Sequence, residues 1–404
     1  MNQRSYRSTR NACYTGFVVQ AIVNNLAPIL FIIFQTELKI SYTMISNLVL
    51  INFVTQLAVD MLSVKFVDRI GYRPLLVASH LFCGVGLILL GLLPRWLPVP
   101  YVGLVIAVIV YAVGGGLIEV LVSPTIESLP SDHKAAAMSL LHSFYCWGQV
   151  AVVLISTLAL RLIGHVHWMW LPICWSVLPL LNAVNFLSVP LVEPAAEEKG
   201  STLRELFSAR FFLIALVLMT CAGASELAMS QWASLFAEKS LGISKVLGDL
   251  LGPCMFAVLM GAGRMLYGLY GHRVKIHAAL TGCAALCVAA YLLTALSPWP
   301  MMSLVGCGLC GLSVSLMWPG VFSLSAASFP RGGTAMFALL AMFGDLGCSF
   351  GPWLAGVMSD VAEQTPSLGM DSLKFGILIG TAFPLLMTAL LLAYRARRRA
   401  KVHA

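Results

Sequence analysis

The chain has 404 residues, of which 59% are hydrophobic and only 10% are charged, whereas a soluble globular protein carries about 25% charged residues. Too few charges are present to cover a surface that faces water, so the composition predicts an all-α membrane protein. The net charge of +8 does not indicate a nucleic-acid partner, because the positive residues lie in short connections and tails, where membrane proteins concentrate Lys and Arg.

Apolar segments follow one another along the whole chain. A helix that crosses a bilayer needs about 20 mostly apolar residues, and the sequence predicts twelve such spans: 12–35, 44–65, 74–93, 101–124, 136–160, 168–190, 211–236, 246–270, 276–296, 300–325, 334–358 and 374–394. The first is too long for the apolar core of a cleavable signal, so we interpret it as a span. The short connections leave no room for a large soluble domain.

The longest polar connection lies near the middle of the chain. It predicts an N-terminal six-helix bundle at 1–190, a cytoplasmic central loop at 191–210 and a C-terminal six-helix bundle at 211–404. The two halves also look alike, because Ser128-Leu129-Pro130 and Ser328-Phe329-Pro330 are each followed by Ala-Met and then Phe at a nearly constant offset. This pattern indicates an internal repeat of six helices.

The distribution of Lys and Arg predicts the orientation. With both termini and the 191–210 loop in the cytoplasm, 18 of these residues lie on the cytoplasmic side. Only 6 lie on the other side, with Arg264 set aside as part of a span: Lys39, Arg95, Arg161, Lys239, Lys245 and Lys374. Positive residues favour the cytoplasmic side, so we expect a multi-pass protein of the cell (plasma or inner) membrane with both termini inside.

Charged residues lie within the predicted spans, among them Asp60, Glu119, Glu226, Arg264 and Asp345. Each costs about 3 kcal/mol at the centre of a bilayer on insertion scales, so these side chains should face a cavity or pair with one another. Asp60 and Arg264 lie toward the cytoplasmic ends of their spans, where a structural pair or a position at a helix end near the membrane interface is the favoured interpretation. For Glu119 and Glu226 a functional role is favoured.

Polar residues form stripes at helical spacing on five of the spans. The stripes are Gln20 and Asn24; Asn52, Gln56 and Asp60; Glu119, Ser123 and Glu127; Ser139, His142, Cys146 and Gln149; and Glu226, Ser230 and Ser234. Helices that line a wet cavity require such a stripe; the alternative is interhelical hydrogen bonding, at about 0.6 kcal/mol each. Three tryptophans add aromatic surface to the stripes, and four others near span ends are interpreted as an interfacial belt: Trp147, Trp232 and Trp318, and Trp96, Trp168, Trp170 and Trp299.

The connection from Val64 to Arg73 carries a motif. It resembles the signature of the major facilitator superfamily, Gly-x-Leu-Ala-Asp-Arg-x-Gly-Arg-Arg/Lys, in which Asp68, Arg69, Gly71 and Arg73 match and Val64 replaces the first glycine. The resemblance implies two six-helix bundles that move by rocking, and a gating role for the motif. In that family the loop acid interacts with the start of a helix of the C-terminal half. The alternative is a solvated positive loop.

Within that superfamily, Gly114–Glu119, Leu141–Phe144 and Gly223–Trp232 resemble the fucose-permease-like branch of sugar:proton symporters. The resemblance implies uptake of a sugar or a related polar solute, with a coupling proton on Glu119, which matches the acid of that branch. The branch also uses an acid on the first span, where this sequence has only Gln20, Asn24 and Asn25. A carboxyl group in a partly dry cavity can alternate between neutral and charged forms. We therefore expect titrating roles for Glu119 and Glu226, and secondary titrating roles for Asp345 and His142. We expect contacts to solute from the polar and aromatic stripes, including Gln56.

Other functions are carried as alternatives. The first is an efflux antiporter for drugs or metabolites, which would share the fold, the motif and the buried acids; a non-transporting receptor or an enzyme is more remote. We expect no cofactor and no metal, because the Gly-x-Gly-x-x-Gly pattern at Gly306–Gly311 lies inside an apolar span and favours helix packing. We expect a monomer.

Overall fold

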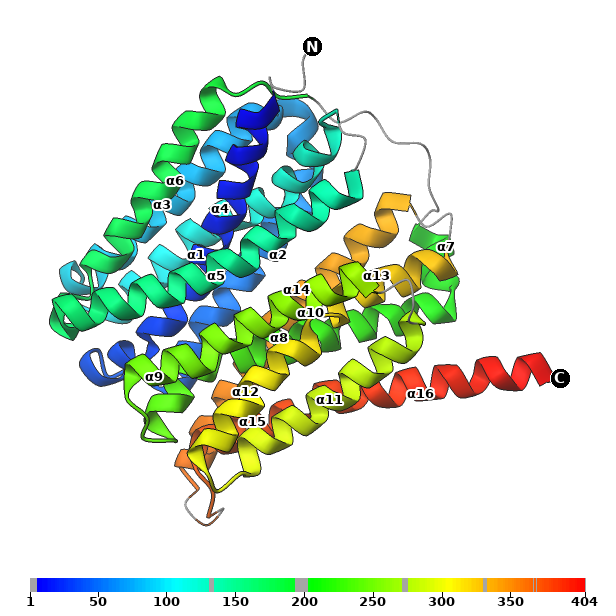
Figure 1. Cartoon of the computed structure of the whole chain (residues 1–404). Helices are drawn as coiled ribbons and strands as arrows, with labels where there is room; N and C mark the ends of the chain where they lie inside the picture. Colours follow the sequence, from blue (N-terminus) through cyan, green and yellow to red (C-terminus); the bar gives the residue numbers. More distant parts are fainter. Residues whose placement is uncertain are drawn as a thin grey trace. The chain divides into compact units, whose positions relative to one another are not determined.

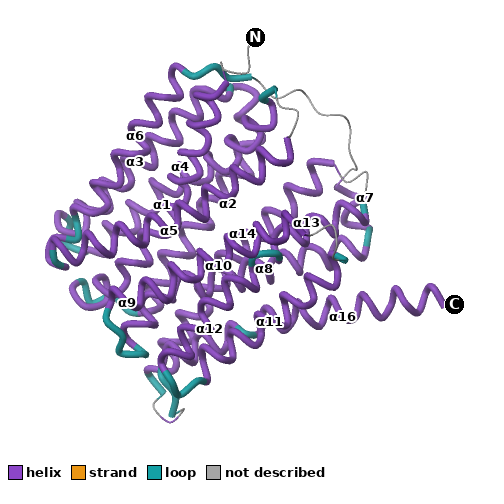
Figure 2. Tube along the Cα trace, in the orientation of Figure 1, coloured by secondary structure: helices purple, strands orange, loops and turns teal. Residues whose placement is uncertain are grey.

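The computed structural model describes residues 6–130, 134–192, 203–270, 275–329, 333–365, 367 and 369–403. Within these residues every regular element is a helix (Figure 2). The helices belong to two compact units, 1–197 and 198–404 (Figure 1). The prediction of an all-α protein built from long apolar helices is confirmed.

The first unit contains six long helices and one 3-10 turn. They are α1 (Arg7–Glu37), α2 (Tyr42–Ile70), α3 (Tyr72–Trp96), α4 (Pro100–Ser128), α5 (Lys134–Ile163), η2 (His165–His167) and α6 (Trp170–Ser188). Helix α4 packs along α3 and α2, α6 packs along α3, and α5 packs along α1.

The second unit contains more elements because several of its spans are interrupted. They are α7 (Leu203–Ser208), α8 (Arg210–Lys239), α9 (Lys245–Asp249), the π-helical turn η3 (Leu250–Cys254), α10 (Met255–Tyr270), α11 (Ile276–Leu296), α12 (Pro300–Val314), α13 (Met317–Ser328), α14 (Gly333–Glu363), α15 (Ser372–Gly380) and α16 (Ala382–His403). One span is formed by α9, η3 and α10, another by α12 and α13, and another by α15 and α16.

Each of the twelve predicted spans coincides with one of these helices or groups of helices. By length and composition, eleven spans among the described residues are apolar enough to cross a membrane. The remaining predicted span, 334–358, corresponds to α14, which has 31 residues.

The same order of helix pairing appears in both units. In the first unit the third and fourth spans pack together, as do the first and fifth and the second and fourth. In the second unit the corresponding pairs are α11 with α12 and α13, α8 with α14, and α10 with α12. Shared pairing agrees with the six-helix repeat that the sequence predicts.

Proline lies at or just after each interruption in the spans of the second unit. Proline lacks an N–H and clashes with the carbonyl group four residues earlier. Pro253 lies in the π-helical turn, Pro319 follows the break at Ser315–Leu316, and Pro384 follows the break at Thr381. The spans predicted at 246–270, 300–325 and 374–394 each contain one of these interruptions.

Two predictions are corrected. The connection 191–210 is not wholly a loop, because Leu203–Ser208 forms α7, whose Leu206 is buried. Trp168 does not belong to an interfacial belt: it is only 1% exposed and packs edge-on against Phe34, with ring centroids 5.5 Å apart. The other proposed belt residues, Trp96, Trp170 and Trp299, are exposed.

Candidate functional site

The amide stripes of α1 and α2 meet in the first unit. Nε2 of Gln56 lies 2.9 Å from Oδ1 of Asn24 and 3.0 Å from Oδ1 of Asn52, and Nδ2 of Asn52 lies 3.2 Å from Oδ1 of Asn24. Nε2 of Gln20 lies 2.8 Å from Oε1 of Gln56. The structure therefore brings four residues of the predicted stripes, Gln20, Asn24, Asn52 and Gln56, into one hydrogen-bonded network.

Glu119 on α4 joins this network. Nε2 of Gln20 lies 3.4 Å from Oε2 of Glu119. Asp60, one helical turn after Gln56, is close enough for the charge of Glu119 to act on it. Neither carboxylate forms an ion pair with a described Lys, Arg or His. We call Gln20, Asn24, Asn52, Gln56 and Glu119 the amide–carboxyl network.

Glycine lets α4 approach this network closely. A Cβ atom on Gly115 would lie 3.2 Å from both Oε1 of Gln20 and Cδ of Gln56, and a Cβ atom on Gly116 would lie 2.9 Å from the carbonyl oxygen of Gln56. Small residues at helix contacts allow backbones to come together in membrane proteins. The run Gly114-Gly115-Gly116 thus brings Glu119 toward the amides of α1 and α2.

The polar stripe of α8 in the second unit contains a carboxylate that is paired with a basic residue. Oε2 of Glu226 lies 3.7 Å from NH2 of Arg264 on α10, and the two side chains are only 13% and 26% exposed. Both residues were predicted as charges within spans, and the structure pairs them. Because this ion pair neutralises Glu226, its carboxylate differs in surroundings from that of Glu119.

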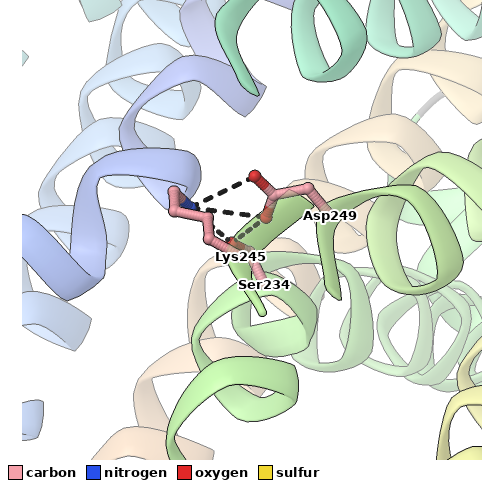
Figure 3. Close-up of polar contacts among 3 residues, drawn as sticks. All are labelled: Ser234, Lys245 and Asp249. Carbon is pink, nitrogen blue, oxygen red and sulfur yellow. Dashed lines mark hydrogen bonds and ion pairs between the residues drawn. The ribbon is translucent and has the colours of Figure 1, made fainter. Parts of the chain in front are cut away.

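The other end of the same stripe meets α9. Ser234 donates a hydrogen bond to Oδ1 of Asp249, and Nζ of Lys245 lies 3.2 Å from both Oδ2 of Asp249 and Oγ of Ser234 (Figure 3). Both charged side chains are buried. Sequence reasoning missed this contact, since it placed Lys245 in a solvated connection and overlooked Asp249. The spacing of Lys245 and Asp249 by four residues could have signalled the pair.

A second overlooked contact lies around His80 on α3. Nδ1 of His80 is 2.8 Å from the carbonyl oxygen of Leu76, so Nδ1 carries the proton, and Nε2 accepts from Asn182, 2.9 Å away on α6. Nδ2 of Asn182 also donates to the carbonyl oxygen of Ala12 on α1, at 2.9 Å. The buried histidine therefore links three helices. A single histidine within an apolar span is the sequence feature that could have indicated this contact.

The sequence comparisons decide the family. No curated protein sequence is a significant match for the chain. The model of the Major Facilitator Superfamily matches residues 12–352.

The chain belongs to the major facilitator superfamily.

Solved structures of other superfamily members share the fold. A D-xylose–proton symporter matches with a TM-score of 0.73 at 15% identity, over 95% of this chain and 97% of that chain. A bacterial homologue of the human lysosomal transporter Spinster gives 0.74 at 15% identity, over 98% of both chains. The E. coli fucose:proton symporter gives 0.66 at 17% identity, over 96% and 98%. Family and fold together identify a multi-pass membrane transporter and not an enzyme.

The superfamily motif does not form a loop in this member. Helix α2 continues to Ile70 and α3 begins at Tyr72, so the whole connection is Gly71. Its φ of 87° lies in the left-handed region that glycine tolerates. Arg69 is exposed, and the side chain of Asp68 lies outside the described residues.

Arg73 contacts a helix end. Its NH1 lies 2.8 Å from the carbonyl oxygens of Phe186 and Leu187, and its NH2 lies 2.8 Å from that of Val189. Helix α6 ends at Ser188, and the last carbonyl groups of a helix have no partner within it. Arg73 therefore caps α6 with a positive charge, which favours the negative end of the helix dipole.

The remaining predicted site residues are spread over both units. His142 on α5 is exposed and packs edge-on against Phe17, with ring centroids 5.1 Å apart, and Trp147 is 58% exposed. Trp232 is fully buried and donates from Nε1 to the carbonyl oxygen of Pro352, at 3.0 Å, which favours packing over contact with solute. The contacts of His142 with Phe17 and of Trp232 with Pro352 lie outside the amide–carboxyl network.

Two predicted residues lie on neighbouring helices of the second unit. A Cβ atom on Gly344 of α14 would lie 2.2 Å from Cη2 of Trp318, so the indole of α13 rests on that glycine. Asp345, the next residue, is buried. Trp318 and Asp345 are therefore neighbours, whereas the first unit supplies the amide–carboxyl network.

Proposed function

We propose that this transporter carries a small polar solute, a sugar or a related metabolite, by proton-coupled symport with alternating access, in the cell membrane and with both termini in the cytoplasm. The observation that carries the proposal is the amide–carboxyl network, which gathers four carboxamides and a carboxylate from three helices of an apolar unit. Polar groups within membrane-spanning segments are costly and mark solute or ion pathways.

Hydrogen-bond accounting favours a solute rich in hydroxyl groups. A carboxamide has two N–H donors and one carbonyl acceptor. The N–H groups of Gln20 are directed at Gln56 and Glu119, and those of Gln56 at Asn24 and Asn52. Oε1 of Gln20 is buried and has no hydrogen-bond partner among the described residues. The missing partner is a donor, which a sugar or nucleoside hydroxyl supplies.

The neighbours in structure point the same way. Their names describe a D-xylose–proton symporter, a fucose:proton symporter and a nucleoside transporter. These solutes all carry hydroxyl groups, and two of the three proteins are named for proton coupling. At identities of 12–17% this likeness supports the class of solute and not its identity.

Glu119 is the proposed coupling residue. It lies in the network without a described basic partner, so its carboxylate can bind a proton or accept a hydrogen bond from a hydroxyl group of the solute. Glu226 is held by Arg264, and we assign it, with Asp345 and His142, a secondary part. The motif residues Asp68 and Arg69 are proposed to bias the conformational equilibrium without contacting solute.

Binding is tested first with the purified chain. A panel of sugars, sugar acids, nucleosides, amino acids and drugs is screened by thermal shift, because a solute at a hundredfold excess over Kd stabilises the folded state by about 2.7 kcal/mol. Hydroxyl-rich solutes should raise the melting temperature. Stabilisation by lipophilic drugs alone would contradict the proposed solute class.

Transport is tested in proteoliposomes with the solute that the screen identifies. An inward proton gradient should drive accumulation by the wild type, and the Glu119→Gln variant should lose accumulation but keep equilibrium counterflow, since glutamine preserves hydrogen bonding and cannot titrate. If Glu119→Gln concentrates solute at the wild-type rate, coupling through Glu119 is wrong. Solute entry accompanied by proton exit would indicate the alternative, an antiporter.

A further inference from the structure

Asp60 and Glu119 lie at the same level of neighbouring helices. Helices α2 and α4 touch where a Cβ atom on Gly116 would lie 3.0 Å from Cβ of Val59. Asp60 follows Val59, and Glu119 follows Gly116 by three residues, so both carboxyl groups come within a turn of this contact. The charge of Glu119 acts on Asp60, which agrees with this placement.

One of the two carboxyl groups has an unsatisfied acceptor. Oδ1 of Asp60 is buried and has no hydrogen-bond partner among the described residues. Glu119 accepts from Nε2 of Gln20, whose side chain is only 4% exposed. The orphan acceptor of Asp60 calls for a donor, and the smallest donor is a proton on one of the two carboxyl groups.

No described basic group neutralises the pair. On α1 the facing residue is Gln20, an amide. The histidine of α3, His80, is occupied by Leu76 and Asn182, and the histidine of α5, His142, packs against Phe17 of α1. The second unit differs, because its Glu226 has Arg264 as a partner.

We propose that Asp60 and Glu119 share one proton, which makes Asp60 a second proton-binding residue of this transporter. Two neighbouring carboxylates repel each other, so binding one proton relieves the repulsion and supplies the missing donor. The pair takes up one proton and later releases the same proton, and no other bond forms or breaks. The inference deepens the proposed function and rests on it for its role in transport.

The experiment follows the proton directly and needs no solute. The full chain is reconstituted in vesicles of phosphatidylcholine and phosphatidylglycerol, and the infrared absorption of protonated carboxyl groups is measured at neutral pH and after a shift to alkaline pH, in H2O and in D2O. The variants are Asp60→Asn, Glu119→Gln and the charge-retaining Asp60→Glu. Glu363→Gln, an exposed carboxyl at the end of α14, is the matched control.

The wild type should show the absorption of one protonated carboxyl per chain at neutral pH, and the alkaline shift should remove it. Asp60→Asn and Glu119→Gln should each lose the whole of this signal, because the remaining carboxylate has no like charge beside it, while Asp60→Glu and Glu363→Gln should keep it. A signal that persists in Asp60→Asn overturns the proposal. So does a signal in the wild type that sodium chloride removes and choline chloride does not, which would indicate a sodium site.

Two safeguards keep the outcome decisive. If Asp60→Asn does not fold, Glu119→Gln tests the same pair from the other side, since a shared proton is lost in either variant. If the wild type shows the signal but no solute is accumulated under a proton gradient, the proposed symport fails and the carboxyl pair stands. If accumulation is proton-driven and the signal is absent, the pair fails and symport stands.

Discussion

Glu119 and Glu226 carry the same functional group in different ionic surroundings. The carboxylate of Glu226 lies 3.7 Å from the guanidinium of Arg264, whereas among the described residues Glu119 accepts a single long hydrogen bond, from the amide of Gln20. A partly buried ion pair holds both partners in their charged forms, and removing one partner strands the other. The two glutamates should therefore respond differently to neutralisation.

Glu226→Gln should destabilise the protein. The substitution leaves the guanidinium of Arg264 without its counter-charge, and breaking such a pair costs on the order of 3 kcal/mol. The double variant Glu226→Gln/Arg264→Gln should be more stable than the single variant, because no charge is stranded. Melting temperature in detergent is the measurement. Equal stability of the single variant and the wild type would show that the pair contributes nothing.

Substitutions of the motif residues Arg73 and Asp68 are predicted to have different effects on stability and transport. Arg73→Ala removes three hydrogen bonds from the end of α6 and should lower the free energy of unfolding by about 1–2 kcal/mol. Asp68→Asn should leave stability and solute affinity nearly unchanged and slow transport. Thermal melts and transport rates of both variants decide this. An Arg73→Ala protein as stable as the wild type would contradict the capping role.

At the scale of elements, α8 and α14 are held together along a line of glycines. A Cβ atom on Gly223 would lie 2.2 Å from the carbonyl oxygen of Gly344, and one on Gly347 would lie 2.0 Å from that of Thr220. These glycines leave no room for any side chain between the two backbones. Close approach gains dispersion contacts, which drive helix association where lipid tails remove the hydrophobic difference.

Gly347→Ala should therefore be destabilising. The added methyl group must separate α8 from α14, and overpacking of this kind costs about 1–3 kcal/mol. Gly282→Ala on α11 is the matched control, since a Cβ atom there meets nothing within 4 Å and alanine favours a helix over glycine by up to about 1 kcal/mol. Thermal melts should place Gly347→Ala below the wild type and Gly282→Ala at or above it.

At the scale of the whole molecule, the orientation in the membrane follows from the charge bias of the sequence. The connection 191–210 should face the cytoplasm and the connection around Thr365 the opposite side. Single cysteines at Ser201 and Thr365, in a background without accessible native cysteines such as exposed Cys174, are probed on intact cells with an impermeant thiol reagent. Thr365→Cys should react and Ser201→Cys should not. The reverse pattern would invert the topology.

The spans were predictable because apolarity over about 20 residues is a strong local signal in a membrane protein. The breaks in the second unit were not, since prolines such as Pro28 and Pro124 lie inside continuous helices while Pro319 follows a break. Local sequence does not distinguish these cases, because the freed backbone groups are satisfied by neighbouring helices.

The network was predictable in part. Helical spacing placed Gln20, Asn24 and Gln56 on polar stripes, but which stripes meet depends on how helices pack, so the link from Gln20 to Glu119 needed the structure. Asp60 was interpreted as a structural pair or a helix end near the interface, and no ion pair to it occurs among the described residues. The contact of Asp249 with Ser234 also needed the structure, because the two residues lie on different helices.

The glycine contact between α8 and α14 provides a fixed reference distance for spectroscopic measurements. Because the two backbones touch, these helices have no freedom to slide apart without losing their packing. Labels at the exposed positions Val217 on α8 and Leu346 on α14 should report one constant distance throughout the transport cycle. This label pair serves as an internal reference for distance measurements. When its distance stays constant, a distance change in another label pair is assigned to motion elsewhere in the protein and not to separation of α8 from α14.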